Sequence, residues 1–145
     1  MLDVYQATGG NGLALEEVPA AETHKYGVVS VAGKAGPSGA VPLSGMVEKP
    51  PQGTAPSNLT ILGRYILQPE IFAILKRQER GSGGEIQLTD AMRVLMTTQP
   101  FWGLAYEGRS FDCGSKIGFL AANIALALAR EDLGPELKAL LRRLV

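Results

Sequence analysis

Glycine and proline gather in four clusters along this chain, and those clusters limit the length of any helix or strand. They lie at residues 9–12, 33–42, 50–56 and 81–84. Both residue types interrupt regular secondary structure, and each cluster separates segments that are apolar or periodic. The chain has 145 residues, which fits one domain. We therefore expect turns and surface loops at the clusters, within a single domain over residues 1–145.

The segments between the clusters change from strand-like to helix-like along the chain. Short β-branched and apolar stretches predict strands at 13–18, 26–31, 45–49, 59–67 and 101–107, with Gly63 marking a bulge or a close approach. Helical spacing of apolar residues predicts helices at 69–80, 87–97, 117–130 and 136–144. Strands followed by helices, with crossovers between them, predict a layered α/β or α+β domain.

Two of these helices carry expectations about burial. The 87–97 segment is expected to turn Ala91, Val94 and Leu95 toward the core, together with the preceding Ile86. The 117–130 helix is apolar on nearly all sides, so we expect it to be deeply buried.

Charge and composition exclude several classes of function. Lys plus Arg number 14 and Asp plus Glu number 14, so the formal net charge is zero, and neither nucleic acid nor an anionic membrane is expected as the main partner. One cysteine and one histidine cannot form a disulfide framework or a Cys/His zinc cage. The first residues lack the basic and apolar regions of a signal peptide, and no stretch approaches the ~20 apolar residues of a membrane span. We expect a cytoplasmic protein.

The first candidate site is Glu48-Lys49-Pro50, at the end of a predicted strand. A lysine at the rim of a sheet is a flexible cation that suits a phosphate. A glutamate beside it can accept hydrogen bonds from sugar hydroxyls. From the pattern alone, a solvated charged pair at a strand end is the favoured interpretation.

The second candidate is Phe111-Asp112-Cys113-Gly114. An aspartate in a tight turn after a strand can be a ligand for a hard cation such as Mg²⁺. The pattern alone favours the alternative that Asp112 is the N-cap of the helix that starts near Ser115. Cys113 is expected to be a small buried apolar residue rather than a nucleophile.

The third candidate is the glycine-rich segment that leads into the 87–97 helix, Gly83-Gly84-Glu85-Ile86-Gln87-Leu88-Thr89-Asp90. A loop of this kind can hold a phosphate at a helix N-terminus. It lacks the Gly-Lys-Ser/Thr ending of a P-loop. We therefore expect the polar residues of this segment to cap the helix.

Taken together, these segments resemble the C-terminal half of the bacterial UTP–glucose-1-phosphate uridylyltransferases, which are sugar-1-phosphate nucleotidyltransferases. The resemblance covers nearly the whole chain. The Glu-Lys-Pro element is shared across that wider family, whereas Glu-Ile-Gln-Leu-Thr-Asp with Asp-Cys-Gly is similar to the glucose/UTP branch. The residues that carry it, in order, are Lys25-Tyr26-Gly27-Val28-Val29, Val47-Glu48-Lys49-Pro50, Ala55-Pro56-Ser57-Asn58-Leu59, Gly63-Arg64-Tyr65, Gly84-Glu85-Ile86-Gln87-Leu88-Thr89-Asp90-Ala91 and Asp112-Cys113-Gly114.

The resemblance implies a reaction and a role for each site residue. A phosphate oxygen of glucose 1-phosphate attacks the α-phosphate of UTP, giving UDP-glucose and pyrophosphate with Mg²⁺ as cofactor. Lys49 would bind the sugar phosphate and Asp112 would be one of two carboxylates that hold Mg²⁺; these are the implied catalytic residues. Glu48 would accept hydrogen bonds from the glucose hydroxyls, the backbone of Gly27 would approach the sugar, and Ile61 would line the sugar pocket.

The resemblance also implies what this chain lacks. The family's N-terminal nucleotide-binding half, with its glycine-rich loop, its uracil contacts and its own Mg²⁺ carboxylate, has no counterpart here. We therefore expect the C-terminal part of a Rossmann-like α/β fold, a mixed sheet flanked by helices, with little turnover on its own. Missing strands would leave an open sheet edge that favours a homo-oligomer.

Three other interpretations stay open from the sequence. One is a different sugar-1-phosphate nucleotidyltransferase, such as a thymidylyltransferase, because the base contacts lie outside this chain. Another is a module that binds a nucleotide sugar without catalysis. The last is a fragment with no function of its own.

Overall fold

The computed structural model describes residues 1–36, 38–80 and 84–144, which fall into two compact units. Among the described residues, the first unit, Met1–Tyr106, contains all the strands, and the second, Glu107–Val145, contains two helices. Each unit is described by itself.

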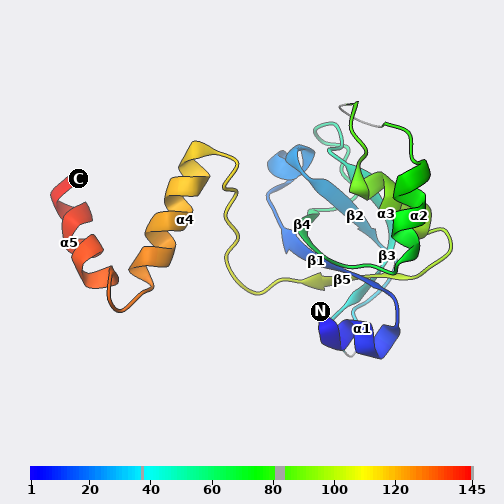
Figure 1. Ribbon diagram of the computed structural model, residues 1–145, viewed down its shortest axis with the longest axis horizontal. Coiled ribbons are helices and arrows are strands. Elements are labelled where there is room, and N and C mark those ends of the chain that lie inside the picture. The colour runs from blue at the N-terminus through cyan, green and yellow to red at the C-terminus, as the bar shows by residue number, and fades with distance from the viewer. Residues whose placement is uncertain (37, 81–83, 145) are drawn as a thin grey trace. The chain divides into compact units, whose positions relative to one another are not determined.

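The elements follow the predicted order of strands and helices (Figure 1). The first unit contains α1 (Leu2–Thr8), β1 (Asn11–Glu17), the 3-10 helix η1 (Ala20–Lys25), β2 (Gly27–Val31), β3 (Val41–Glu48), β4 (Leu59–Ile66), α2 (Glu70–Arg77), α3 (Leu88–Leu95) and β5 (Phe101–Ala105). The second contains α4 (Lys116–Leu128) and α5 (Gly134–Leu144). Each predicted strand and helix is present, whereas α1 and η1 lie outside the predicted ranges.

Two strands extend into segments that the sequence predicted as loops. β1 begins at Asn11, inside the first glycine cluster, and the turn before it is made by Gly9 at φ +63°. β3 begins at Val41, so Pro42 lies in the strand. Pro42 is the second residue of the strand, where its missing N–H costs at most one ladder hydrogen bond, and its carbonyl accepts a hydrogen bond from the backbone N–H of Ala32 at 2.8 Å.

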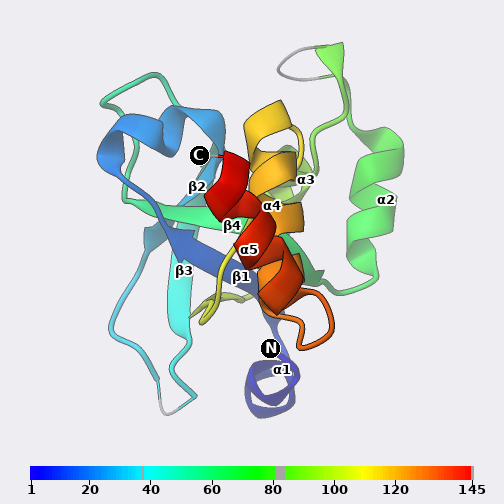
Figure 2. The same ribbon diagram turned by 90° about the vertical axis from the view of Figure 1, so that its left-hand side faces the viewer.

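The five strands form one mixed sheet that closes on itself in the order β1-β4-β2-β3-β5. β1 and β5 are parallel, and the other neighbouring pairs are antiparallel. Figure 2 shows β1 and β4 side by side. The mixed sheet with flanking helices confirms the predicted fold class. The expected open edge is wrong for the described strands, because closure gives every strand two neighbours.

Two bulges let the strands curve while apolar side chains still point inward. In β4, Tyr65 pairs with Leu13 and Ile61 pairs with Leu15, so the segment around Gly63 holds two more residues than the facing part of β1. Gly63 has φ +73°, which glycine adopts without strain, and the predicted bulge is confirmed. A second irregularity, opposite Ser30 in β3, resets the alternation so that Leu43 and Met46 are both buried.

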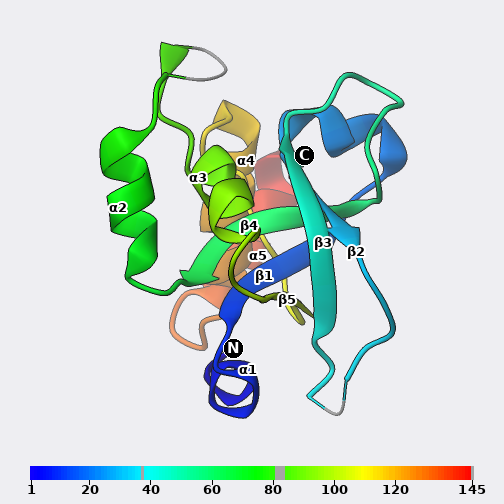
Figure 3. The ribbon, with the colours of Figure 1, turned by 90° about the vertical axis from the view of Figure 1, so that its right-hand side faces the viewer.

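The core lies between the inner face of the sheet and the helices α2 and α3. α3 packs against β3, and α2 packs against α3 (Figure 3). The buried residues of this core are Leu13, Leu15, Val29, Leu43, Met46, Ile71, Ala91, Met92, Leu95 and Phe101.

The buried face of α3 differs in part from the predicted one. Ala91 and Leu95 are buried as expected, together with Met92, but Val94 and Ile86 are about half exposed. The face follows the positions i, i+3, i+4 and i+7 counted from Leu88, and Val94 falls outside that set.

The predicted deep burial of the 117–130 helix is not met within the second unit. Ile117 and Leu126 of α4 are 77% and 63% exposed, and Ala122 is the buried residue of this helix. Within its unit α4 packs against α5, which covers one side. An apolar composition indicates that a helix is favoured in a buried position, but it does not determine which other element packs against it. No described helix combines the length and the apolar character that crossing a bilayer requires.

We predict that Gly103→Ala in β5 destabilises the first unit. A Cβ at Gly103 would overlap the Leu15 side chain and lie 3.0 Å from Leu43 Cδ2. Overpacking of this kind lowers the free energy of unfolding by about 2 kcal/mol, measured by urea denaturation. Gly12→Ala is the control, because its Cβ would meet atoms no nearer than 3.9 Å. Equal effects of the two substitutions would contradict the packing described here.

Candidate functional site

Three of the predicted site residues converge on one point at the end of the β2–β3 pair. The antiparallel register sets Gly27 of β2 directly opposite Glu48 of β3. A Cβ on Gly27 would lie 3.0 Å from Glu48 Oε2 and 3.2 Å from the Cδ1 atom of Ile61 in β4. A carboxylate oxygen and an apolar methyl group thus face a backbone that carries no side chain. The structure brings together the residues that the sequence predicted to bind substrate from three separate strands.

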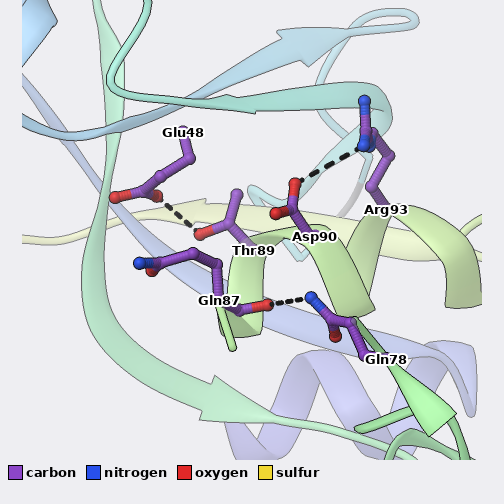
Figure 4. Close-up of polar contacts among 6 residues, drawn as sticks. All are labelled: Glu48, Gln78, Gln87, Thr89, Asp90 and Arg93. Carbon is purple, nitrogen blue, oxygen red and sulfur yellow. Dashed lines mark hydrogen bonds and ion pairs between the residues drawn. The ribbon is translucent and has the colours of Figure 1, made fainter. Parts of the chain in front are cut away.

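Thr89, near the start of α3, is also part of this cluster. Its hydroxyl donates a hydrogen bond to Glu48 Oε2 at 2.7 Å (Figure 4). A Cβ on Gly27 would lie 3.5 Å from the same hydroxyl oxygen. The expected capping role is wrong for this residue: the N-cap of α3 is Gln87, and no side chain caps it. Sequence reasoning missed the contact because 41 residues separate Thr89 from Glu48.

Lys49 follows Glu48 in an unusual backbone conformation. Its φ of +44° lies in the left-handed region, which side chains other than glycine rarely adopt. The conformation is held on both sides: the Lys49 N–H donates to the carbonyl of Tyr26 at 3.0 Å, and the ring of Pro50 is buried. Strained residues of this kind gather at binding sites. The conformation leaves the side chain exposed at the end of the strand, as the sequence predicted.

Tyr65 of β4 lies in the electric field of the Glu48 carboxylate. Partial burial of the phenol is the larger cause that raises the pKa of Tyr65 above 10.0, and the negative charge of Glu48 adds to the shift. Both causes disfavour the ionised tyrosinate. Tyr65 is thus a second residue of β4, besides Ile61, that belongs to the surroundings of the Glu48 carboxylate.

Asp112 lies in the second unit, in a turn that precedes α4. Its Oδ1 atom accepts a hydrogen bond from the N–H of Gly114 at 3.0 Å. The N-cap of α4 is Ser115, whose hydroxyl accepts from the N–H of Gly118 at 3.0 Å. The alternative that Asp112 is the N-cap is therefore wrong. Cys113 is exposed, so its predicted burial is also wrong.

The donor chemistry of Asp112 fits a single ligand to a hard cation. Its carboxylate is exposed at a turn. Within the described ranges, no three His, Cys, Asp or Glu side chains are grouped closely enough to form a metal cage. Mg²⁺ is usually held by one or two carboxylates together with waters and substrate phosphates. One carboxylate from this chain is compatible with that pattern.

Comparison with known proteins now places the chain in a family. The profile of the nucleotidyl transferase family matches residues 1–127. The chain belongs to this family. The matched range includes the Gly27–Glu48–Ile61 cluster, Lys49, Thr89 and Asp112.

Several relatives of the chain are named as UTP–glucose-1-phosphate uridylyltransferases or UDP-glucose pyrophosphorylases. The chain is 44% identical over 144 residues to the UTP–glucose-1-phosphate uridylyltransferase of Staphylococcus epidermidis, covering 99% of this chain and 49% of that protein. A UTP-bound UDP-glucose pyrophosphorylase from Acinetobacter baumannii superposes with a TM-score of 0.85 at 37% identity, covering 100% of this chain and 49% of that one. A UDP-glucose pyrophosphorylase complexed with UDP-glucose gives 0.81 at 39% identity, covering 88% and 48%. The chain thus spans about half the length of the curated relatives it matches.

We predict that Tyr65 titrates above pH 10.0 and that Glu48→Gln brings its pKa part of the way back. Because the folded-state pKa is raised, the contribution of Tyr65 to stability is full below its unfolded pKa and is lost as the pH rises through the folded value. The ¹³Cζ resonance of Tyr65 measures the titration. Glu79→Gln, the same change of charge at an exposed residue, is the control. An unchanged titration in Glu48→Gln would show that the charge of Glu48 does not contribute to the raised pKa of Tyr65.

Proposed function

We propose that this nucleotidyl transferase chain provides the sugar-phosphate side of a UTP–glucose-1-phosphate uridylyltransferase. The overall reaction joins glucose 1-phosphate to the uridylyl group of UTP and releases pyrophosphate. The observation that carries the proposal is the convergence of Gly27, Glu48 and Ile61 on one point, with Lys49 next in the chain. The names of the relatives support the choice of sugar phosphate and nucleotide.

Each residue of the cluster has a function that follows from its chemistry. The Glu48 carboxylate accepts hydrogen bonds only, so it suits the hydroxyl donors of a sugar. Gly27 lets the side chains of Glu48 and Ile61 lie close against its backbone, because a Cβ there would come within 3.0 Å and 3.2 Å of them. Ile61 offers an apolar surface to the C–H faces of the ring.

Lys49 addresses the main electrostatic obstacle of the reaction. Two phosphate groups must approach each other, and a cation beside them offsets their repulsion. The left-handed backbone at Lys49 holds the start of its side chain in place next to Glu48. The ammonium group can therefore hold the sugar phosphate while Glu48 holds the hydroxyls, which orients the attacking oxygen.

Asp112 would be one carboxylate ligand of Mg²⁺. When bound, the ion would neutralise phosphate charge and polarise the phosphoryl oxygens. We propose that the nucleotide-binding residues and the other metal carboxylate belong to the half that the longer relatives have in addition. The isolated chain is then expected to bind sugar phosphate without efficient turnover, in the cytoplasm. Assembly into a homo-oligomer stays a prediction.

The decisive experiment combines binding with turnover. Isothermal titration with glucose 1-phosphate tests the site on this chain, and pyrophosphate release from UTP and glucose 1-phosphate with Mg²⁺ tests catalysis. Binding without turnover supports the proposal. Turnover that depends on Lys49 would show that the nucleotide site also lies within these residues. Absence of glucose 1-phosphate binding would contradict the proposal.

Two rival functions give different results. A thymidylyltransferase would prefer dTTP to UTP once the complementary half is added. A nucleotide-sugar-binding module would bind UDP-glucose with no response to Mg²⁺, because the carboxylate of Asp112 would then be idle. The uridylyltransferase names of the relatives favour the proposal over both.

We predict that Lys49→Ala weakens glucose 1-phosphate binding about tenfold or more, since one hydrogen bond to a charged group is lost. The side chain is exposed, so the free energy of unfolding should change by less than about 0.5 kcal/mol. Isothermal titration and urea denaturation measure the two quantities. Lys76→Ala removes an exposed lysine from α2 and should leave the affinity unchanged. Equal affinities of Lys49→Ala and wild type would remove Lys49 from the site.

We predict that Asp112→Asn abolishes the response of the 112–114 turn to Mg²⁺ without unfolding it. An asparagine oxygen can accept the same hydrogen bond from the Gly114 N–H, so the turn is kept while the charge is lost. Amide NMR shifts during a Mg²⁺ titration measure the response. Asp3→Asn, at an exposed aspartate in α1, should retain it. A response that survives in Asp112→Asn would rule out this carboxylate as a ligand.

A further inference from the structure

The hydrogen bond between Thr89 and Glu48 joins two parts of the chain that the sequence keeps far apart. Thr89 Oγ1 donates to Glu48 Oε2 at 2.7 Å, from the first turn of α3 to the last residue of β3. A hydroxyl that donates to a carboxylate forms one of the stronger types of hydrogen bond in proteins. Figure 4 shows the two side chains directed toward each other.

The position of Thr89 is fixed by the core and not by the site. α3 packs its buried residues Ala91, Met92 and Leu95 against the inside of the sheet. Thr89 lies on the same turn as the start of this face, so a rigid helix holds its hydroxyl. A threonine within a helix often bonds a carbonyl of its own preceding turn. Here the hydroxyl reaches across to β3 instead.

The bond limits the freedom of the glutamate. A free glutamate side chain loses substantial rotamer entropy when a ligand fixes it. With Oε2 held by Thr89, the Glu48 side chain loses this rotamer entropy when the chain folds. The carboxylate is therefore already oriented when a ligand binds. The same Oε2 atom is the atom nearest to the position of a Cβ on Gly27, so the held carboxylate lies against the Gly27 backbone at the proposed sugar site.

We propose that Thr89 is a positioning residue that holds the Glu48 carboxylate for a sugar hydroxyl. The inference rests on the proposed sugar-phosphate site and assigns a determinant of sugar recognition to α3. The hydroxyl acts as the donor, so the carboxylate keeps its remaining lone pairs for hydroxyl donors of the ligand. Thr89 therefore favours binding of the sugar and contributes nothing to binding of the phosphate.

The matched variants are Thr89→Val, which keeps the shape and removes the hydroxyl, and Thr89→Ser, which keeps the hydroxyl. Thr97→Val is the control, because Thr97 is exposed and its hydroxyl donates to the carbonyl of Val94. Affinities for glucose 1-phosphate and for inorganic phosphate are measured by titration of the full chain. Thermal unfolding shows that each variant is folded.

Thr89→Val should weaken glucose 1-phosphate binding about tenfold and leave the affinity for inorganic phosphate unchanged. Thr89→Ser should restore most of the loss, and Thr97→Val should bind like wild type. An equal loss for both ligands, or no rescue by serine, would indicate a general structural role and overturn the inference.

A second readout separates this inference from the proposed function. Without any ligand, the three-bond couplings of the Glu48 side chain should indicate one rotamer in the wild type and averaging in Thr89→Val. A single rotamer in the wild type, in a chain that binds no glucose 1-phosphate, would support the positioning contact and reject the sugar site. Averaged couplings in the wild type would reject the positioning contact itself.

Discussion

The antiparallel register of β2 and β3 is the constraint on which the candidate site depends. It sets Gly27 opposite Glu48, and a shift of one residue would turn the Glu48 side chain to the other face. The single β2–β4 pairing of Val28 with Thr60 then brings the neighbouring Ile61 toward Gly27. Hydrogen bonds of the backbone, rather than contacts among the site residues, therefore decide which side chains meet.

The core and the site share α3. One face of this helix buries Ala91, Met92 and Leu95, and the adjacent Thr89 reaches Glu48. Packing of apolar residues is nondirectional, but it fixes a helix firmly enough for one hydroxyl to have a defined partner. In this way the apolar packing of α3 orients Thr89, the residue proposed to position Glu48. The left-handed backbone at Lys49 is held by different residues: its N–H bonds to the carbonyl of Tyr26, and the next residue, Pro50, is buried.

Much of this arrangement could be predicted from residues that are near each other in the sequence. The strands, the helices and the bulge at Gly63 follow from local pattern, and Glu48-Lys49-Pro50 is visible as a charged pair at a strand end. Resemblance to the uridylyltransferases added Gly27 and Ile61, which no spacing rule connects to Glu48. Predictions of burial and capping were less successful: α4 is exposed, and Ser115 rather than Asp112 is the cap.

The sequence by itself determined the order and type of the elements, the balance of charge and the identity of the charged residues, because these depend on neighbours within a few positions. The tertiary structure alone decided that the sheet closes, that Gly27 faces Glu48, and that Thr89 bonds a carboxylate 41 residues away. The physical reason is that strand register and helix packing are set by the whole core at once. A hydrogen bond between distant residues leaves no periodic signal in either of the segments that it joins.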